Sequence, residues 1–335
     1  MSQLSTALAD VGVKLSPLQQ DGSDVALTWD PAVTGPVFGD EVLVALPDMH
    51  LASGADGDIF RGFDGSSLGR LQKLLSGLLA VRGGFPKLSL VQMGDLYDVW
   101  RAYPQYKDHP TSDYRVIEKA YGSALGMLTQ QLQARICVGN HDAGLGLFPP
   151  AWARGPNGVT DQLAYGHTFG SGRVLAFHGH QADRIGAAMA AQGGSAVVQV
   201  ATEVAKLANP LVQLVERGID LLGDFFGDTP MSLSDALNAR WAGADPPSDA
   251  HGFQSPRWCD RGDRDHLQTV VGALPNAADI RMVFVGHSHR PGISALHVPV
   301  PGRLVPLVDV GSWVWGRSQI ALACEGEVRL WTMAP

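Results

Sequence analysis

Short apolar runs separated by turn residues recur along most of the chain. Each run is rich in Val, Leu or Ile, and most of them stop at Gly or Pro, which is typical of buried strands. They are EVLVALP (41–47), KLSLVQM (87–93), ARICV (134–138), RVLAFH (173–178), RMVFV (281–285), LVPLVDV (304–310), SQIALAC (318–324) and EVRLW (327–331). The pattern predicts a core rich in strands, with a last third that is mainly strand.

Two segments between the early runs carry apolar residues at steps of three and four, which is the spacing of an amphipathic helix. They are SSLGRLQKLLSGLLAV (66–81) and SDYRVIEKAYGSALGMLTQQL (112–132). Strands that alternate with helices favour an α/β fold.

The alternation breaks in the region from 183 to 270. A helical pattern there is interrupted at Pro210 and gives way to a segment rich in Pro, Asp and Arg. We therefore expect a helical insertion or cap at 183–270 and a core formed by 41–182 and 271–335. Residues 1–40, with their turn signals, are expected to form an N-terminal extension.

Composition narrows the class of protein. The chain has 335 residues, of which 45% are apolar and 17% charged, with 40 Gly and 21 Pro, and this indicates a loop-rich globular protein with a substantial core. A formal net charge of −8 disfavours a nucleic-acid partner. The three cysteines lack CxxC spacing, which disfavours a thiolate zinc site and a disulfide framework and fits a reducing compartment. The chain shows neither the layout of a signal peptide nor a membrane-spanning stretch, so we expect a cytoplasmic protein. The sequence does not determine its oligomeric state.

Histidines and aspartates gather directly after several of the predicted strands. The clusters are PDMH (47–50), GDLYD (94–98), GNHD (139–142), HGH (178–180) and GHSH (286–289). The carboxyl ends of strands are where α/β folds place ligands, and residues two apart on an extended segment point the same way. One such cluster alone is more often an ordinary turn. All of them together, in this order, predict a metal site.

The order D-x-H, GD-x-x-D, GNH-D, H-G and GH-x-H resembles the motif set of the calcineurin-like metallophosphoesterases, over residues 41–182 and 271–312. This resemblance implies a four-layer α/β/β/α sandwich, in which two packed mixed sheets are flanked by helices. It also implies two divalent transition-metal ions, of which manganese is the first expectation. Imidazole and oxygen ligands without thiolate suit Mn, Fe, Zn, Co and Ni and do not select among them. The reaction would be in-line attack of a metal-bridging hydroxide on a phosphomonoester, phosphodiester or pyrophosphate.

The resemblance also implies a ligand set. The first metal would be held by Asp48, His50 and His289, the second by Asn140, His178 and His287, with Asp95 bridging the two.

Two further residues would stand beside the metals. His141 would stabilise phosphate oxygens or protonate the leaving group, and Asn140 is expected in the same catalytic set. Asp98 has two interpretations. It either orients His141 through a carboxylate–imidazole hydrogen bond or caps a helix that begins at LYDVWRAY.

The substrate is open at this point. GDLYDVW together with DMHL resembles the bacterial branch that contains UDP-2,3-diacylglucosamine diphosphatases, the pyrophosphate hydrolases of lipid A synthesis, which carry a helical insertion before the final GH-x-H. His180 and Arg290 are candidate substrate contacts. The apolar helices expected over 187–226 either grip a lipid-like substrate or a membrane surface, or pack against the core or a second subunit. A protein-binding scaffold of the same fold is the alternative that is not an enzyme.

Overall fold

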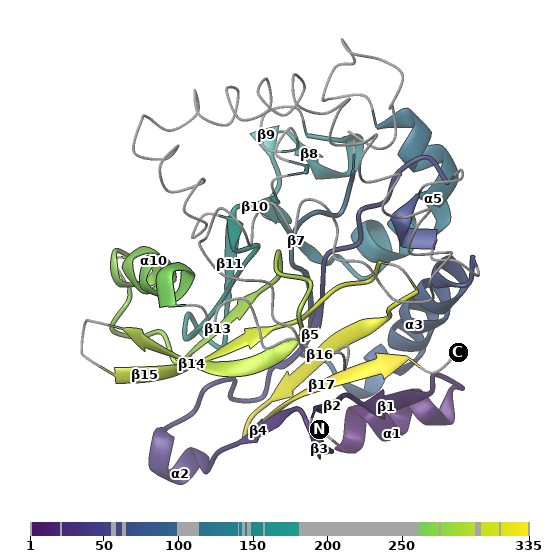
Figure 1. Cartoon of the computed structure of the whole chain (residues 1–335). Coiled ribbons are helices and arrows are strands. Elements are labelled where there is room, and N and C mark those ends of the chain that lie inside the picture. Colours follow the sequence, from purple (N-terminus) through teal and green to yellow (C-terminus); the bar gives the residue numbers. More distant parts are fainter. Residues whose placement is uncertain are drawn as a thin grey trace.

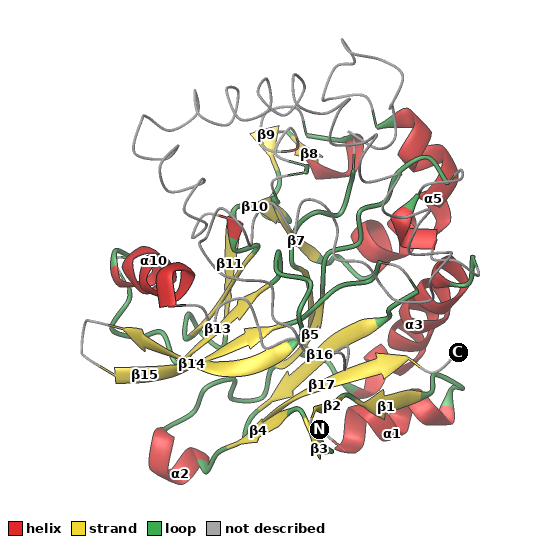
Figure 2. Cartoon of the chain, in the orientation of Figure 1, coloured by secondary structure: helices red, strands yellow, loops and turns green. Residues whose placement is uncertain are grey.

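The computed structural model describes residues 2–20, 22–54, 58–61, 65–98, 114–139, 141–142, 145, 149–156, 158–180, 261–274, 276–298, 303–314 and 316–333. Two sheets form the centre of the described part, one of eight strands and one of five (Figures 1 and 2). Both sheets combine parallel and antiparallel pairs. The expected α/β class is therefore confirmed.

The larger sheet has the strand order β1-β17-β16-β5-β6-β7-β10, and β4 also pairs with β17. Its centre is parallel and consists of β5 (Val42–Leu46), β6 (Leu88–Gln92) and β7 (Arg135–Cys137). The other strands are β1 (Leu15–Pro17), β4 (Ala26–Thr28), β10 (Leu163–Ala164), β16 (Gln319–Cys324) and β17 (Glu327–Met333).

The smaller sheet has the order β11-β12-β13-β15-β14. Its strands are β11 (Gly166–Phe169), β12 (Val174–Phe177), β13 (Met282–Val285), β14 (Gly292–Val298) and β15 (Arg303–Asp309). The inner three are parallel, and the two edge strands run antiparallel to their neighbours. Two small hairpins complete the strands, β2 (Gln19–Gln20) with β3 (Ser23–Asp24) and β8 (Arg154–Gly155) with β9 (Gly158–Val159).

Helices cover the outer faces of both sheets (Figures 1 and 2). On the larger sheet these are α1 (Ser2–Asp10), α3 (Ser67–Val81) and α5 (Arg115–Gly126), and on the smaller sheet α10 (Arg261–Gly272). A short helix, α2 (Pro31–Thr34), precedes β5, and a π-helical turn over Met127–Gln131 continues α5. Within the described residues, no helix combines the length and apolarity that crossing a membrane requires.

Alternate residues of the central strands face different cores. In β5, Val44 and Leu46 pack beneath the helices of the larger sheet, whereas Leu43 and Ala45 face the smaller sheet. The alternate residues of β13 divide in the same way between the smaller sheet's helix and the larger sheet. The two sheets therefore pack face to face. Strands buried on both sides need apolar residues at every position, which explains why the sequence shows continuous apolar runs. Every strand predicted from these runs is present, as are both predicted helices in their described parts.

Residues 1–40 contribute to the larger sheet. Strands β1 and β4 pair with β17, and α1 contacts α3. The carboxylate of Glu325 accepts hydrogen bonds from the backbone N–H groups of Val37, Phe38 and Gly39, at 2.6–2.9 Å, and so fastens this segment to the β16–β17 hairpin.

The insertion expected at 183–270 lies outside the described residues up to position 260. Its expected boundary at 270 falls within α10, whose Leu267 and Val271 belong to the core of the smaller sheet. The helices expected over 187–226 also lie outside the described residues.

The carboxyl ends of parallel strands from both sheets meet at one edge of the structure. Asp48 follows β5, Asp95 follows β6 and His178 follows β12. The backbone N–H of Gly286, directly after β13, donates to the carbonyl of His178 at 2.9 Å. Clusters that are far apart in the sequence are thus neighbours in space.

Candidate metal centre

The backbone is strained where the Asp and His clusters occur. Left-handed φ angles are uncommon for residues other than Gly and concentrate at functional sites. Among the described residues other than Gly, they occur at His50 (51°), Asp95 (49°), His287 (68°) and His289 (56°), and elsewhere only at Gln133 and Ser171. Most of this strain therefore lies in the loops that carry the candidate ligands.

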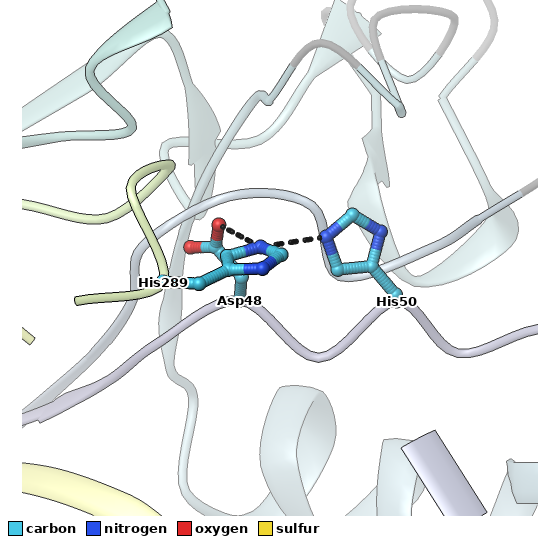
Figure 3. Close-up of side chains that lie close together, drawn as sticks. All are labelled: Asp48, His50 and His289. Atoms are coloured by element: carbon cyan, nitrogen blue, oxygen red, sulfur yellow. Dashed lines mark hydrogen bonds and ion pairs between the residues drawn. The ribbon is translucent and has the colours of Figure 1, made fainter. Parts of the chain in front are cut away.

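A first group joins Asp48, His50 and His289, with one ligand atom of each within 4.8 Å of the others. Nε2 of His289 lies 3.1 Å from Oδ2 of Asp48 and 3.1 Å from Nε2 of His50 (Figure 3). One carboxylate oxygen and two imidazole nitrogens thus converge in the interior. Divalent transition metals bind to such a set of ligands.

A second group joins Asp95, His178 and His287 within the same limit. Oδ2 of Asp95 lies 3.3 Å from Nε2 of His178 and 3.5 Å from Nε2 of His50, so one carboxylate oxygen faces both groups. Nδ1 of His178 lies 2.9 Å from the carbonyl of Met93. A proton on Nδ1 that is donated to this carbonyl leaves the lone pair of Nε2 for a cation, which is how hydrogen-bond partners usually orient metal-bound histidines.

The charges around these groups favour a bound cation. Burial disfavours a charged His178, but the carboxylates of Asp95 and Asp48 outweigh it and raise the pKa of His178 to about 10. Burial would also raise the pKa of Asp95, yet the neighbouring His178 and His141 hold this pKa well below its usual value. The buried carboxylates thus stabilise a positive charge next to them. A divalent cation can supply this charge in place of the proton on His178.

His50 differs in charge from His178. Its burial and the neighbouring His141 lower the pKa of His50, which favours the neutral imidazole that binds metals. The residues present therefore fit divalent metal ions.

Three glycines leave room for the ligands. A Cβ atom at Gly94 would lie 2.7 Å from the ring of His178, and one at Gly139 or Gly286 would lie closer than 3.0 Å to a carboxylate oxygen of Asp95 or Asp48. Real Cβ atoms do not approach other atoms so closely. The Gly that begins each of these motifs is therefore required by the space that the ligands occupy.

His141 and Asp98 lie beside the first group. Oδ2 of Asp98 is 3.3 Å from Nδ1 of His50 and 3.5 Å from Nδ1 of His141, and the rings of the two histidines are 4.5 Å apart. Asp98 thus faces His141, as one of its two interpretations requires. The alternative helix cap would involve residues 99–113, which lie outside the described part of the chain. A third group of possible ligands joins His50, Asp95 and His141, which gives His141 a second potential role as a ligand.

The remaining expected site residues are placed less closely. Asn140 lies outside the described residues. The ring of half-buried His180 is 5.3 Å from the ring of His178 and 6.4 Å from that of His287, and His180 belongs to none of the three groups. Arg290 is half-buried directly after His289, and its backbone N–H donates to the hydroxyl of Ser288 at 3.0 Å.

Sequence reasoning missed the residues that hold these loops in place. Asp142 accepts hydrogen bonds from Gly139, Leu96 and Tyr97, and burial together with Asp95 raises the pKa of Asp142 to about 7. In the GHSH loop, Ser288 donates to the buried Asp309. The guanidinium of Arg317 donates to the carbonyl of His289 at 3.0 Å. The Asp of GNHD was a visible signal for the first of these. Asp309 and Arg317 belong to no motif in the sequence.

No protein-family model matches the chain, and no curated protein matches its sequence. The interpretation of the site therefore rests on its own geometry. Buried Asp and His groups from separate strand ends converge and can hold metal ions.

Proposed function

We propose that this chain is a dinuclear metal-dependent phosphoester hydrolase of the calcineurin-like metallophosphoesterase type. The observation that carries the proposal is the position of Asp95, whose Oδ2 faces His50 of one group and His178 of the other. If each group holds one metal ion, a carboxylate in this position can bind both ions at once and so bridge them. The face-to-face sheets with outer helices agree with the sandwich of that family.

In this proposal Asp48, His50 and His289 hold one ion, and His178 and His287 hold the other together with Asn140. Two divalent ions, of which manganese is the first candidate, would activate a water molecule for attack. They would also stabilise the negative charge on the phosphoryl oxygens. The proposed ligand set includes only Asp48 and Asp95 as carboxylates, so the occupied site keeps a net positive charge despite the acidic protein.

The side chains beside the metals have separate roles. His141 is close enough to the first group to contact a phosphoryl oxygen or to protonate the leaving group. Oδ2 of Asp98 lies 3.3 Å from Nδ1 of His50 and 3.5 Å from Nδ1 of His141, so it would favour the tautomers in which each ring presents Nε2. His180 would contact the substrate from beside the second group, and Arg290 from the position next to His289.

The substrate is a phosphomonoester, a phosphodiester or a pyrophosphate. A pyrophosphate hydrolase similar to UDP-2,3-diacylglucosamine diphosphatases is the narrower alternative, and it rests on the resemblance of GDLYDVW and DMHL. A protein-binding scaffold without activity is a further alternative. The complete Asp and His groups disfavour it, because scaffolds have no need to keep buried ligands together.

Hydrolysis of p-nitrophenyl phosphate and bis-p-nitrophenyl phosphate by the metal-free protein, reloaded with Mn²⁺, tests the proposal. We expect activity that depends on the metal and falls by at least about 100-fold in Asp95→Asn, since even the partners of metal ligands contribute 10- to 100-fold. Asp58→Asn is the matched control. Asp58 is also a buried carboxylate that accepts backbone N–H groups, but it belongs to no ligand group. Protein that binds none of Mn, Fe, Zn, Co and Ni and cleaves neither ester would support the scaffold instead.

A further inference from the structure

Asp142, the last residue of GNHD, is buried between two loops that carry candidate ligands. Its Oδ1 accepts a hydrogen bond from the backbone N–H of Gly139, in its own loop, at 2.6 Å. Its Oδ2 accepts from Leu96 at 2.7 Å and from Tyr97 at 3.3 Å, in the loop that follows Asp95. One carboxylate thus binds both loops.

A second carboxylate makes the opposite connection. Oδ1 of Asp95 accepts a hydrogen bond from the backbone N–H of His141 at 2.8 Å, while its Oδ2 faces the two groups of histidines. Each loop therefore offers a carboxylate to a backbone amide of the other loop. The two links use neighbouring residues in both loops. Asp95 accepts from His141, and Asp142, the residue after His141, accepts from Leu96, the residue after Asp95.

We propose that Asp142 is a positioning residue, whose carboxylate sets the distance and orientation between the loop of Asp95 and the loop of His141. The role rests on the proposed function, because it matters only if Asp95 bridges metals and His141 acts beside them. Asp142 itself belongs to none of the three ligand groups. It acts through the backbone.

The hydrogen bonds to Asp142 matter because the backbone at Asp95 is strained. Asp95 has a φ of 49°, a strained value for a residue with a side chain, and it needs the surrounding structure to hold it. The N–H groups of Leu96 and Tyr97, which follow directly, are the groups that Asp142 binds. The two loops also touch, since a Cβ atom at Gly139 would lie closer than 3.0 Å to the backbone nitrogen of Asp95. A shift of one loop is therefore passed to the other.

Asp142→Asn tests the role with little change of shape. One acceptor oxygen becomes an NH₂ donor that faces a backbone N–H, so one side of the link is lost. A displacement of about 1 Å at a reacting group lowers rates about 100-fold. We expect kcat on the p-nitrophenyl esters to fall by about that factor with little change in KM, and the spin coupling between two bound Mn²⁺ ions, measured by electron paramagnetic resonance, to change.

Two further variants complete the test. Asp142→Glu keeps both acceptor oxygens on a longer side chain, so an intermediate kcat, about 10-fold below wild type, is expected. Glu325→Gln is the control, because Glu325 also accepts three backbone N–H groups, but these precede β5, whereas Asp48 follows the opposite end of this strand. It should lower the melting temperature and leave kcat and the spin coupling unchanged.

The outcomes separate the two proposals. Wild-type protein without hydrolysis and without a coupled Mn²⁺ pair overturns the proposed function itself. Active wild type with a folded Asp142→Asn variant that keeps its kcat and spin coupling overturns only the positioning role. Should Asp142→Asn fail to fold, Asp142→Glu decides, because folded protein with wild-type kcat and coupling would contradict the role, and the intermediate kcat with altered coupling supports it.

Discussion

Gly286→Ala is a direct steric test of the candidate metal centre. The new Cβ atom would lie closer than 3.0 Å to Oδ1 of Asp48. It would also lie 3.2 Å from the Cβ of Met93, so it has little room to shift toward Met93. The φ angle of Gly286 lies outside the left-handed region, so the substitution adds crowding without backbone strain. The carboxylate of Asp48 must therefore move.

The size of the effect follows from the contacts of Asp48. Normal carbon–oxygen contacts require a withdrawal of about 1 Å, and a misplacement of that size costs about 100-fold in rate. The same carboxylate accepts a hydrogen bond from the backbone of His287 at 2.9 Å and faces His289 at 3.1 Å. Both contacts would be lost together. We expect Mn²⁺ affinity and kcat/KM each to fall about 100-fold, which corresponds to about 2.7 kcal/mol.

Gly77→Ala in α3 provides the matched control. A Cβ atom there would also lie closer than 3.0 Å to its neighbour, but that neighbour is the side chain of Val13 in the apolar core. Overpacking costs about 1–3 kcal/mol of stability, and the better helix propensity of Ala recovers about 1 kcal/mol. Titration calorimetry with Mn²⁺ and thermal unfolding separate the two cases. Wild-type Mn²⁺ affinity in Gly286→Ala, or an equal loss of affinity in Gly77→Ala, would refute the steric argument.

Further predictions concern the two histidines of HGH and the metal itself. His178→Ala should lower the metal content by one ion per chain in elemental analysis, whereas His180→Ala should leave it unchanged; equal metal loss in both variants would contradict the separation of their roles. His180→Ala should instead raise KM for the esters, and an unchanged KM would remove His180 from the substrate contacts. Removal of metal by a chelator should lower the melting temperature, because a ligand at 100 times its Kd stabilises the folded state by about 2.7 kcal/mol. An unaltered unfolding curve after complete metal removal would argue against a metal site in the folded protein.

The central strands could be predicted from the sequence because they are buried on both faces. A strand such as β5, with Leu43 facing one core and Val44 the other, needs apolar residues throughout, and such runs are easy to recognise. The edge strands could not be recognised. In β1 only three residues, Leu15–Pro17, pair with β17, and β14 mixes buried and exposed positions along GISALHV. Their place in the sheet depends on partners that are distant in the sequence.

The candidate ligands could be predicted for a similar reason. His50 and Asp95 follow apolar runs directly, so the parallel strands bring them to one edge. The residues that orient them could not be found in this way. The carboxylate of Asp142 accepts hydrogen bonds from the backbone amides of Leu96 and Tyr97, and a sequence does not show which side chain a loop amide will meet. The closeness of His141 to His50, at 4.5 Å between rings, likewise arises only when the loops fold against each other.

The pairing of β1 and β4 with β17 has a consequence for the order of folding. Both strands precede β5 in the chain, whereas the strand that receives them follows β16. During synthesis α1 can pack on α3 early, but β1 and β4 find their partner strand only after β17 has left the ribosome. Contacts of such long sequence separation slow folding. The larger sheet is thus completed only when β17 forms, and a chain cut short before β17 would leave β1 and β4 without the strand with which they pair.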